Sequence, residues 1–360
     1  MSTAIPWWPA TRPCMPPASI GAIPTTAGRS TPSAAPSRRR TTRRSFPPCW
    51  TCAPVPVVVS VPPMEARRYH ALRLTDLYGF NFAYLGSRAT GNGGGRYLVA
   101  GPRWNGAAPT GIATVIRAET ELVSLAGRIQ RFSSSDQANV KRIEAGYRIQ
   151  PLSAYLKKKP PPAPATIEWL APESPAQMRT SLEFYNQLGF LLQFAPAAHS
   201  EKSLRKRLDS MRIRPGAPAV AEGSNPRLRQ VMQEGMHDGQ NEIDKRRLAL
   251  DGKADTLFGD RRTLGNDYLA RAIGAQVGLG TDSREESITT VLATDAAGQP
   301  LDGAQPYTLR FAPRALPPVN AFWSVTLQRP AGAAQASTPS GTRWWIRRCC
   351  PRSSAIATAD

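Results

Sequence analysis

The chain has 360 residues, and its 46 lysines and arginines against 26 aspartates and glutamates give a formal net charge of +20 at pH 7. This length gives room for two domains with a buried core, so the chain does not need a disulfide scaffold to fold. No apolar run reaches the roughly 18–20 residues of a membrane-spanning helix. Three histidines leave little room for a multi-histidine metal centre.

Residues 1–53 differ in composition from the centre of the chain. They contain seven arginines, three of the five cysteines and no aspartate or glutamate. Prolines interrupt every apolar run that could form a secretory signal, so no export signal is recognised. The segment is therefore a disordered basic arm or a stretch read out of frame, and its composition favours the second. Residues 331–360 have four arginines and a single carboxylate, Asp360, and receive the same interpretation. The net charge is then a poor guide to function.

Residues 54–156 form the first predicted domain, which is rich in β-strands. Its apolar residues alternate with polar ones, and glycine turns separate the runs. The glycine run 91–95 predicts a hairpin turn rather than a phosphate cradle, because a strand follows it and no Lys-Ser/Thr is present. Strands are predicted at 55–62, 67–80, 96–100 and 113–117, and one helix is predicted at 133–149.

Residues 157–265 form a proline-rich linker and a helical connector. Apolar residues at helical spacing predict helices at 174–192, 200–213 and 226–250, the first of them capped by Ser174. A further helix at 266–280 opens the last domain, 266–330, in which strands are predicted at 287–303, 306–313 and 319–328. The order strands, helices, strands favours an α+β fold that is mainly antiparallel β.

Asp76 is the strongest single candidate for chemistry, because it lies within an apolar strand. Burial would raise its pKa unless Arg73, Arg88 or Arg128 pairs with it. A paired structural carboxylate is the favoured reading, and a catalytic acid is the alternative. Residues 54–330 contain no cysteine and no Gly-x-Ser-x-Gly, so neither a cysteine nucleophile nor a nucleophile elbow is supported there. No cofactor site and no metal site is predicted.

Two stretches resemble known families of unknown function. Residues 55–155 resemble the domain of unknown function 1254, through Pro-Val-Val-Val-Ser-Val-Pro at 56–62, Leu-Thr-Asp-Leu-Tyr at 74–78 and Tyr-Leu-Val-Ala-Gly-Pro at 97–102. Residues 266–328 resemble its usual companion, the domain of unknown function 1214, above all through Pro-Pro-Val-Asn-Ala-Phe-Trp-Ser-Val-Thr at 317–326. Both ends of the chain depart from the family pattern.

The resemblance implies an N-terminal β-rich domain, a helical connector and a C-terminal jelly-roll-like β-sandwich. Because the family pattern stops near residue 329, that sandwich is expected to be incomplete, with open strand edges. Many relatives look exported, which implies a bacterial protein of the periplasm or cell envelope, although the localisation of this chain stays unassigned.

The leading hypothesis is a ligand-binding or envelope-associated module. Its expected ligand is a small molecule or a glycan, held in a cleft lined by Tyr69, Asp76, Arg88, Trp104 and Arg128. One alternative is a hydrolase or lyase that uses Asp76 with an arginine or tyrosine partner. A second alternative is non-specific binding of polyanions such as nucleic acid by the basic ends. A homo-oligomer is compatible with all three.

Overall fold

The protein's structure is a computed structural model. It describes residues 55–133, 135–162, 167–220, 223–250, 254–278, 281–312 and 315–325, and three strands at 43–45, 49–52 and 345–348. The predictions of disordered or out-of-frame ends, 1–53 and 331–360, therefore lie mostly outside the described residues.

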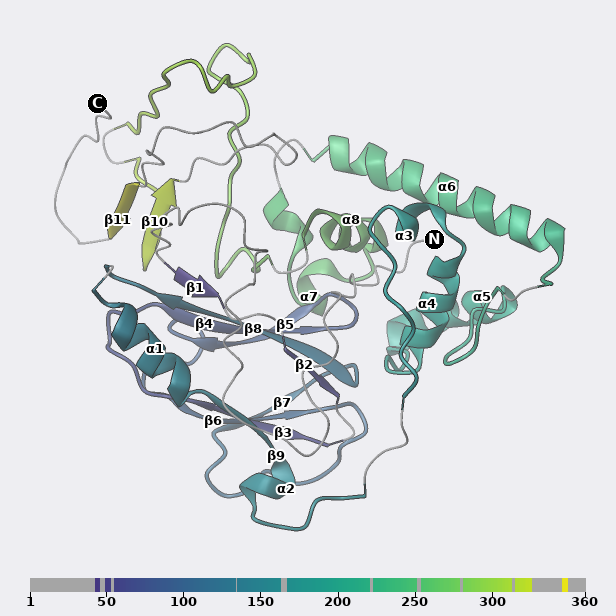
Figure 1. Cartoon of the computed structure of the whole chain (residues 1–360), viewed down its shortest axis with the longest axis horizontal. Helices are drawn as coiled ribbons and strands as arrows, with labels where there is room; N and C mark the ends of the chain where they lie inside the picture. The colour runs from purple at the N-terminus through teal and green to yellow at the C-terminus, as the bar shows by residue number, and fades with distance from the viewer. Residues whose placement is uncertain are drawn as a thin grey trace, which may run out of the picture.

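Two sheets form the N-terminal half (Figure 1). In the first sheet β8 lies beside β4, β4 beside β5, and both β1 and β2 pair with β8, all antiparallel. Its strands are β1 (Arg43–Ser45), β2 (Cys49–Cys52), β4 (His70–Asp76), β5 (Asn81–Gly86) and β8 (Leu122–Gln130). The second sheet has the order β7-β6-β3-β9, in which only β6 and β7 are parallel. Its strands are β3 (Val57–Val61), β6 (Gly95–Ala100), β7 (Thr114–Arg117) and β9 (Arg148–Pro151).

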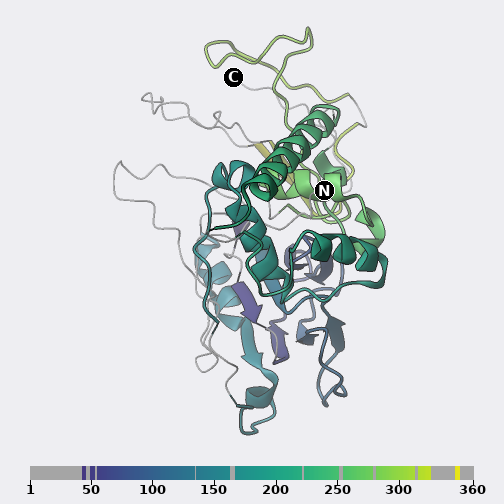
Figure 2. The same ribbon diagram turned by 90° about the vertical axis from the view of Figure 1, so that its right-hand side faces the viewer.

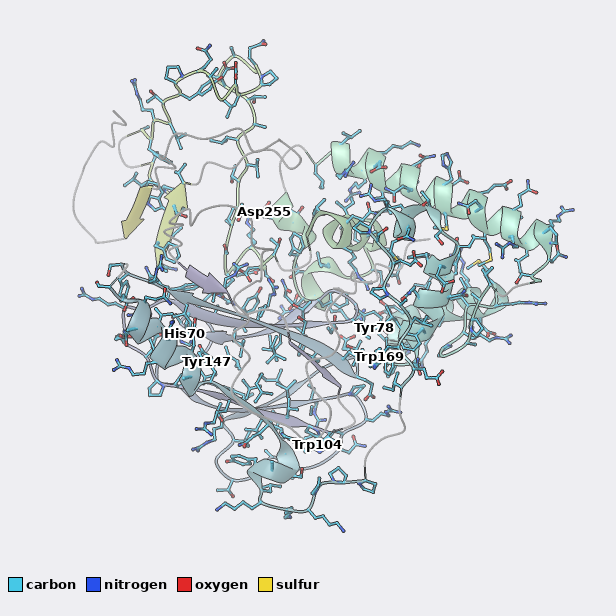
Figure 3. All side chains as sticks on the ribbon, viewed as in Figure 1. His70, Tyr78, Trp104, Tyr147, Trp169 and Asp255 are labelled. Atoms are coloured by element: carbon cyan, nitrogen blue, oxygen red, sulfur yellow. The ribbon has the colours of Figure 1, made fainter. Side chains whose placement is uncertain are left out.

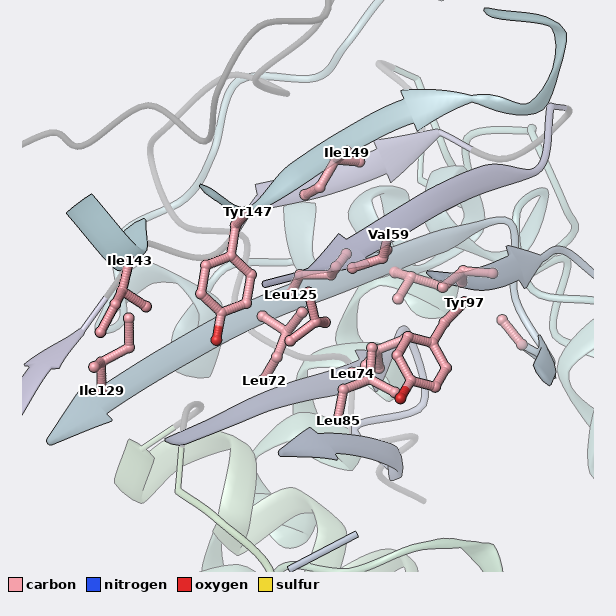
Figure 4. Packing of buried hydrophobic residues seen from close by; sticks show 14 of the residues in the cluster. Val59, Leu72, Leu74, Leu85, Tyr97, Leu125, Ile129, Ile143, Tyr147 and Ile149 are labelled. Atoms are coloured by element: carbon pink, nitrogen blue, oxygen red, sulfur yellow. The ribbon is translucent and has the colours of Figure 1, made fainter. Parts of the chain in front are cut away.

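The core lies between the two sheets, because each contributes alternate apolar side chains to it. Figure 4 shows these side chains converging from both sides. Helix α1 (Gln137–Gly146) closes one edge of the core with Val140 and Ile143. The members labelled in the figure are Val59, Leu72, Leu74, Leu85, Tyr97, Leu125, Ile129, Ile143, Tyr147 and Ile149.

The glycine run at 91–95 is a turn, but it does not close a hairpin. It connects β5 of the first sheet to β6 of the second. Gly94 has φ +75°, and a Cβ there would lie 2.7 Å from the backbone oxygen of Val61. Glycine is thus required by close packing against β3, and the strand that follows leaves no helix N-terminus for a phosphate.

The helical region follows the short helix α2 (Leu152–Tyr155). The predicted helix 174–192 is interrupted at Ser181: Ser174 and Gln177 exchange hydrogen bonds at its start, and α3 ends at Thr180. The longest helix, α6, begins after Asn225, whose side chain accepts a hydrogen bond from the amide of Arg227. The helices are α3 (Gln177–Thr180), α4 (Glu183–Leu192), η1 (His199–Glu201), α5 (Lys202–Ser210), α6 (Pro226–Leu248), η2 (Ala254–Leu257), α7 (Arg261–Leu264) and α8 (Tyr268–Gly278).

Figures 1 and 2 show α6 crossing the end of the molecule opposite α2. Within the described residues, no helix combines the length and apolar character that a membrane span requires.

The C-terminal stretch departs from the expectation. In place of regular strands at 287–303 and 306–313, its described residues hold one isolated bridge, between Thr294 and Pro300. Val291 is 80% exposed, so no described layer covers the apolar side that would stabilise a strand here. Strand β10 (Phe322–Val325) does form and pairs with β11 (Trp345–Arg348).

The α+β class with antiparallel sheets is confirmed, while helix, at 31%, exceeds strand, at 18%. The sheets are mainly antiparallel, as expected, and most of the helix lies in the connector. The jelly-roll-like sandwich stays a prediction.

Candidate functional site

Three of the five predicted ligand-binding residues meet at one place. Tyr69, Arg88 and Arg128 all contact the segment 281–286, which is distant from them in the sequence. Asp76 and Trp104 lie elsewhere. Figure 3 places Trp104 beside α2, and there the guanidinium of Arg117 stacks 5.4 Å from its ring centroid.

We name the meeting place the arginine–tyrosine face, and it consists of Tyr69, Arg73, Tyr84, Arg88 and Arg128. It lies on the outer side of the first sheet, because alternation sends neighbouring apolar residues of β4 into the core. Register places Arg73 directly beside Tyr84 of β5. It also places Arg128 of β8 beside Ala71, the residue next but one before Arg73. Three strands thus bring these donors together.

The first acceptor is Asp282, whose side chain is 3% exposed. Arg73 Nη1 donates to Oδ1 at 3.0 Å, and Arg128 Nη1 donates to Oδ2. Burial lowers the pKa of Arg73, and the carboxylate of Asp282 opposes that shift. The Asp282 carboxylate is therefore a bridge between two guanidinium groups, a geometry typical of strong charge-assisted recognition.

The second acceptor is Glu286, whose side chain is 2% exposed. The Tyr69 hydroxyl donates to Oε1 at 2.8 Å, and Arg88 Nε donates to Oε2 at 2.6 Å. Burial raises the pKa of Tyr69, and the neighbouring carboxylate of Glu286 adds to this. Tyr69 thus stays a neutral hydroxyl donor at physiological pH.

Ser283 is anchored between the two acceptors. Its amide donates to the Tyr84 hydroxyl at 2.8 Å, and its own hydroxyl lies 3.2 Å from that oxygen. Asn81 Nδ2 donates to the Thr281 carbonyl at 3.1 Å. The whole segment 281–286 is therefore held by polar side chains of β4, β5 and β8 and the residues that flank them.

Asp76 is completely buried at the end of β4 and caps the turn into β5. Its Oδ1 accepts the Phe80 amide at 2.9 Å, and Oδ2 has no hydrogen-bond partner among the described residues. Burial raises the pKa of Asp76 to about 7, and the hydrogen bond from Phe80 opposes the shift. The arginines expected to pair with Asp76 pair instead with Asp282 and Glu286.

Other charged side chains surround this turn. Arg261 and Arg271 lie on the Phe80 ring, each with its guanidinium carbon 4.6 Å from the ring centroid. Both donate to Glu201 Oε1, at 3.2 and 3.3 Å. We name Asp76, Phe80, Glu201, Arg261 and Arg271 the Asp76 cluster. It joins the first sheet to η1, α7 and α8.

Sequence reasoning did not place Arg73 among the residues of the expected site, and it did not single out Asp282 or Glu286 at all. The alternation of β4 contains the signal for Arg73, because its apolar neighbours must face the core. The acceptors have no such local signal, since more than 150 residues separate each from its partners. Within the described part of the chain, no group of three or more His, Cys, Asp or Glu side chains could hold a metal ion.

Two family models match the chain. Protein of unknown function (DUF1254) matches residues 52–151, and Protein of unknown function (DUF1214) matches residues 286–343. The second range starts later than predicted and continues past residue 330. Among solved structures, the chain is similar to the VPA0106 protein from Vibrio parahaemolyticus, with 26% identity and a TM-score of 0.63 over 81% of this chain and 69% of that chain. No curated protein matches the sequence.

Proposed function

We propose that this chain, which combines the domain DUF1254 with the domain DUF1214 in that order, is a ligand-binding module that recognises carboxylate groups at the arginine–tyrosine face. One observation carries the proposal: Asp282 and Glu286 each receive a donor on both carboxylate oxygens. Arginine and tyrosine donors fixed by neighbouring strands are suited to bind carboxylates. The expected ligand is a small molecule with two carboxylate groups.

In this arrangement the segment 281–286 occupies the place of such a ligand. It lies outside regular secondary structure, and side chains of the sheet hold it. An attached segment competes at an effective concentration in the millimolar range, so a free ligand binds the wild-type chain weakly. Removal of the two internal carboxylate charges should therefore strengthen binding.

Titration calorimetry with succinate, glutarate and adipate tests this function. The double variant Asp282→Asn with Glu286→Gln should bind at least one of these dicarboxylates at least ten times more tightly than the wild-type chain. Glu285→Gln is the matched control, because Glu285 is exposed and lies in the same segment.

Addition of Arg128→Gln to the double variant should abolish the gain. If the double variant is still folded by circular dichroism but binds none of the three acids, the segment is only an internal tether and the proposed function fails.

A second function, acid–base catalysis in a hydrolase or lyase, is favoured by Asp76. A carboxyl group with a pKa of about 7 and an unbonded oxygen is suited to proton transfer near neutral pH. Asp76→Asn should then keep the fold and lose turnover of a substrate found by screening esters and glycosides. Equal turnover in the two proteins would exclude this role.

Envelope association and polyanion binding by the basic ends stay proposals. The second rests on residues 1–53 and 331–360, of which only the strands β1, β2 and β11 are described. It predicts a steeply salt-dependent affinity for DNA that disappears when both ends are removed. Unchanged affinity after that truncation would exclude it.

A further inference from the structure

The second sheet and its connections form a layer with charges of one sign. This layer consists of the described residues 55–64, 95–118 and 147–162, the last of which include α2. These residues contain no aspartate or glutamate. We name this part of the molecule the basic layer. Its seven basic residues are Arg96, Arg103, Arg117, Arg148, Lys157, Lys158 and Lys159.

Two of the arginines lie on the outer side of the sheet. Ser60 lies between two core valines of β3, so its own side chain points away from the core. Register pairs Ser60 with Arg96 on one side and with Arg148 on the other. With strands about 4.8 Å apart, the backbones of the two arginines are about 10 Å from each other.

In the part of the chain that the structure describes, five of these seven charges form no ion pair. Arg96, Arg148 and the lysines 157–159 are exposed and have no ion-pair partner among the described residues. Arg103 is the exception that pairs with a carboxylate, Glu121, from outside the layer. At the opposite end of the molecule, by contrast, the basic residues 245–247 of α6 each pair with a carboxylate.

Apolar groups accompany these charges. Leu156 is 36% exposed and directly precedes the three lysines. The half-buried Trp104 packs under Arg117 nearby, so its ring face is engaged rather than open to stack on a base. Figures 1 and 3 show α2 and Trp104 together at the end of the molecule that lies away from α6.

We propose that the basic layer is a docking surface for an anionic lipid bilayer. Each lysine or arginine near such a surface contributes about 1 kcal/mol, and leucine and tryptophan side chains suit the interface. The exposed Leu156 beside these charges favours a lipid surface over single-stranded nucleic acid, whose non-specific binding combines positive charge with free aromatic faces. This surface goes beyond the carboxylate-binding function, because it lies on the other sheet and uses none of the same residues.

Cosedimentation of the full chain with vesicles tests the proposal. The vesicles contain phosphatidylglycerol and phosphatidylcholine, or phosphatidylcholine alone. A patch variant changes Arg96, Arg148, Lys157, Lys158 and Lys159 to Gln. A control variant makes the same change at five exposed, unpaired bases of α5 and α6, so that both have the same net charge: Lys202, Lys206, Arg207, Arg227 and Arg229.

The patch variant should lose at least tenfold in partitioning onto anionic vesicles at 0.1 M salt, and the control variant less than threefold. Wild-type chain should not sediment with phosphatidylcholine alone. Equal losses in the two variants would show that only net charge matters, and would overturn the proposal. Loss of DNA binding in the patch variant without vesicle binding in the wild-type chain would also overturn it.

Discussion

The arginine–tyrosine face and the Asp76 cluster both bury carboxylates against the same sheet, but they stabilise them in opposite ways. At the face, Asp282 and Glu286 have a donor on every oxygen, and three of the four donors are guanidinium groups. At the end of β4, Asp76 is completely buried, and one of its oxygens has no hydrogen-bond partner among the described residues. Burial is thus compatible with an ionised carboxylate where both oxygens are paired, and favours the neutral acid where they are not.

This difference assigns the two places different roles. At the face, ion pairs hold the segment 281–286 in one position. If a ligand carboxylate replaces the carboxylates of this segment, the arginine and tyrosine donors still have acceptors. A carboxyl group with a pKa of about 7 instead changes its charge near neutral pH. The first arrangement suits binding, while the second makes the stability of the β4–β5 turn depend on pH.

The largest effect should come from Asp282→Ala. It leaves Arg73 and Arg128 without their shared carboxylate, and loss of one partner from a buried ion pair costs about 3–5 kcal/mol. Urea unfolding at pH 7 measures the loss. Glu285→Ala, on the exposed side of the same segment, should change the free energy of unfolding by less than about 0.5 kcal/mol. A similar small change for both variants would show that the face does not hold the segment.

Asp76→Asn should have the next largest effect, and this effect should develop as the pH rises from about 4 to 7. The pKa of Asp76 is raised from 3.8 to about 7, so the folded state binds this proton more tightly than the unfolded state does. The contribution of the group is fully present below pH 4 and is lost as the pH rises towards 7. From this shift, the wild-type chain should lose about 2–4 kcal/mol relative to the variant between pH 4 and pH 8.

Urea unfolding of the wild-type chain and of Asp76→Asn between pH 4 and pH 8 tests this prediction. The quantity to compare is the slope of the free energy of unfolding against pH, not its absolute value. Parallel curves would mean that Asp76 is ionised in the folded protein and that its free oxygen has a partner.

Tyr69→Phe should cost less, because Glu286 keeps its bond from Arg88. Loss of a hydrogen bond to a charged group costs about 1.5–3 kcal/mol, and the lower half of that range is expected here. Tyr155→Phe is the matched control: the Tyr155 hydroxyl bonds a neutral carbonyl at an exposed position, so a change near 0.5 kcal/mol is expected. If thermal unfolding shows equal losses of stability for Tyr69→Phe and Tyr155→Phe, the charge of Glu286 does not strengthen the hydrogen bond from Tyr69.

The N-terminal domain could be predicted from the sequence because its signals are local. Alternation along 67–80 predicts one strand, and the glycine turn before 96–100 predicts another; β4 and β6 lie there. Helical spacing likewise predicts α4, α6 and α8. The C-terminal stretch has the same alternation at 287–303, but a strand also needs a partner and a layer to cover it, and neither is a property of the stretch itself.

Of the candidate site, the sequence indicated several donor residues but not their carboxylate acceptors. Tyr69, Arg88 and Arg128 are among the five residues expected to line one cleft, and these three do converge. Their acceptors are two of several acidic residues in an unremarkable polar segment, and only the fold brings them near. Asp76 is buried as expected, but the arginines expected to pair with it form ion pairs with Asp282 and Glu286 instead.

The smallest effect should come from an ion pair that lacks burial altogether. Arg214 and Asp209 are joined at 2.5 Å, which is shorter than the contact of Arg73 with Asp282, but their side chains are 60% and 62% exposed. Water solvates both charges, so an exposed pair contributes about 0–1 kcal/mol, and salt screens it. Arg214→Gln should therefore shift the free energy of unfolding by less than about 0.5 kcal/mol, and 0.5 M salt should abolish the shift. A loss as large as that of Asp282→Ala would mean that distance, and not burial, decides what an ion pair contributes in this protein.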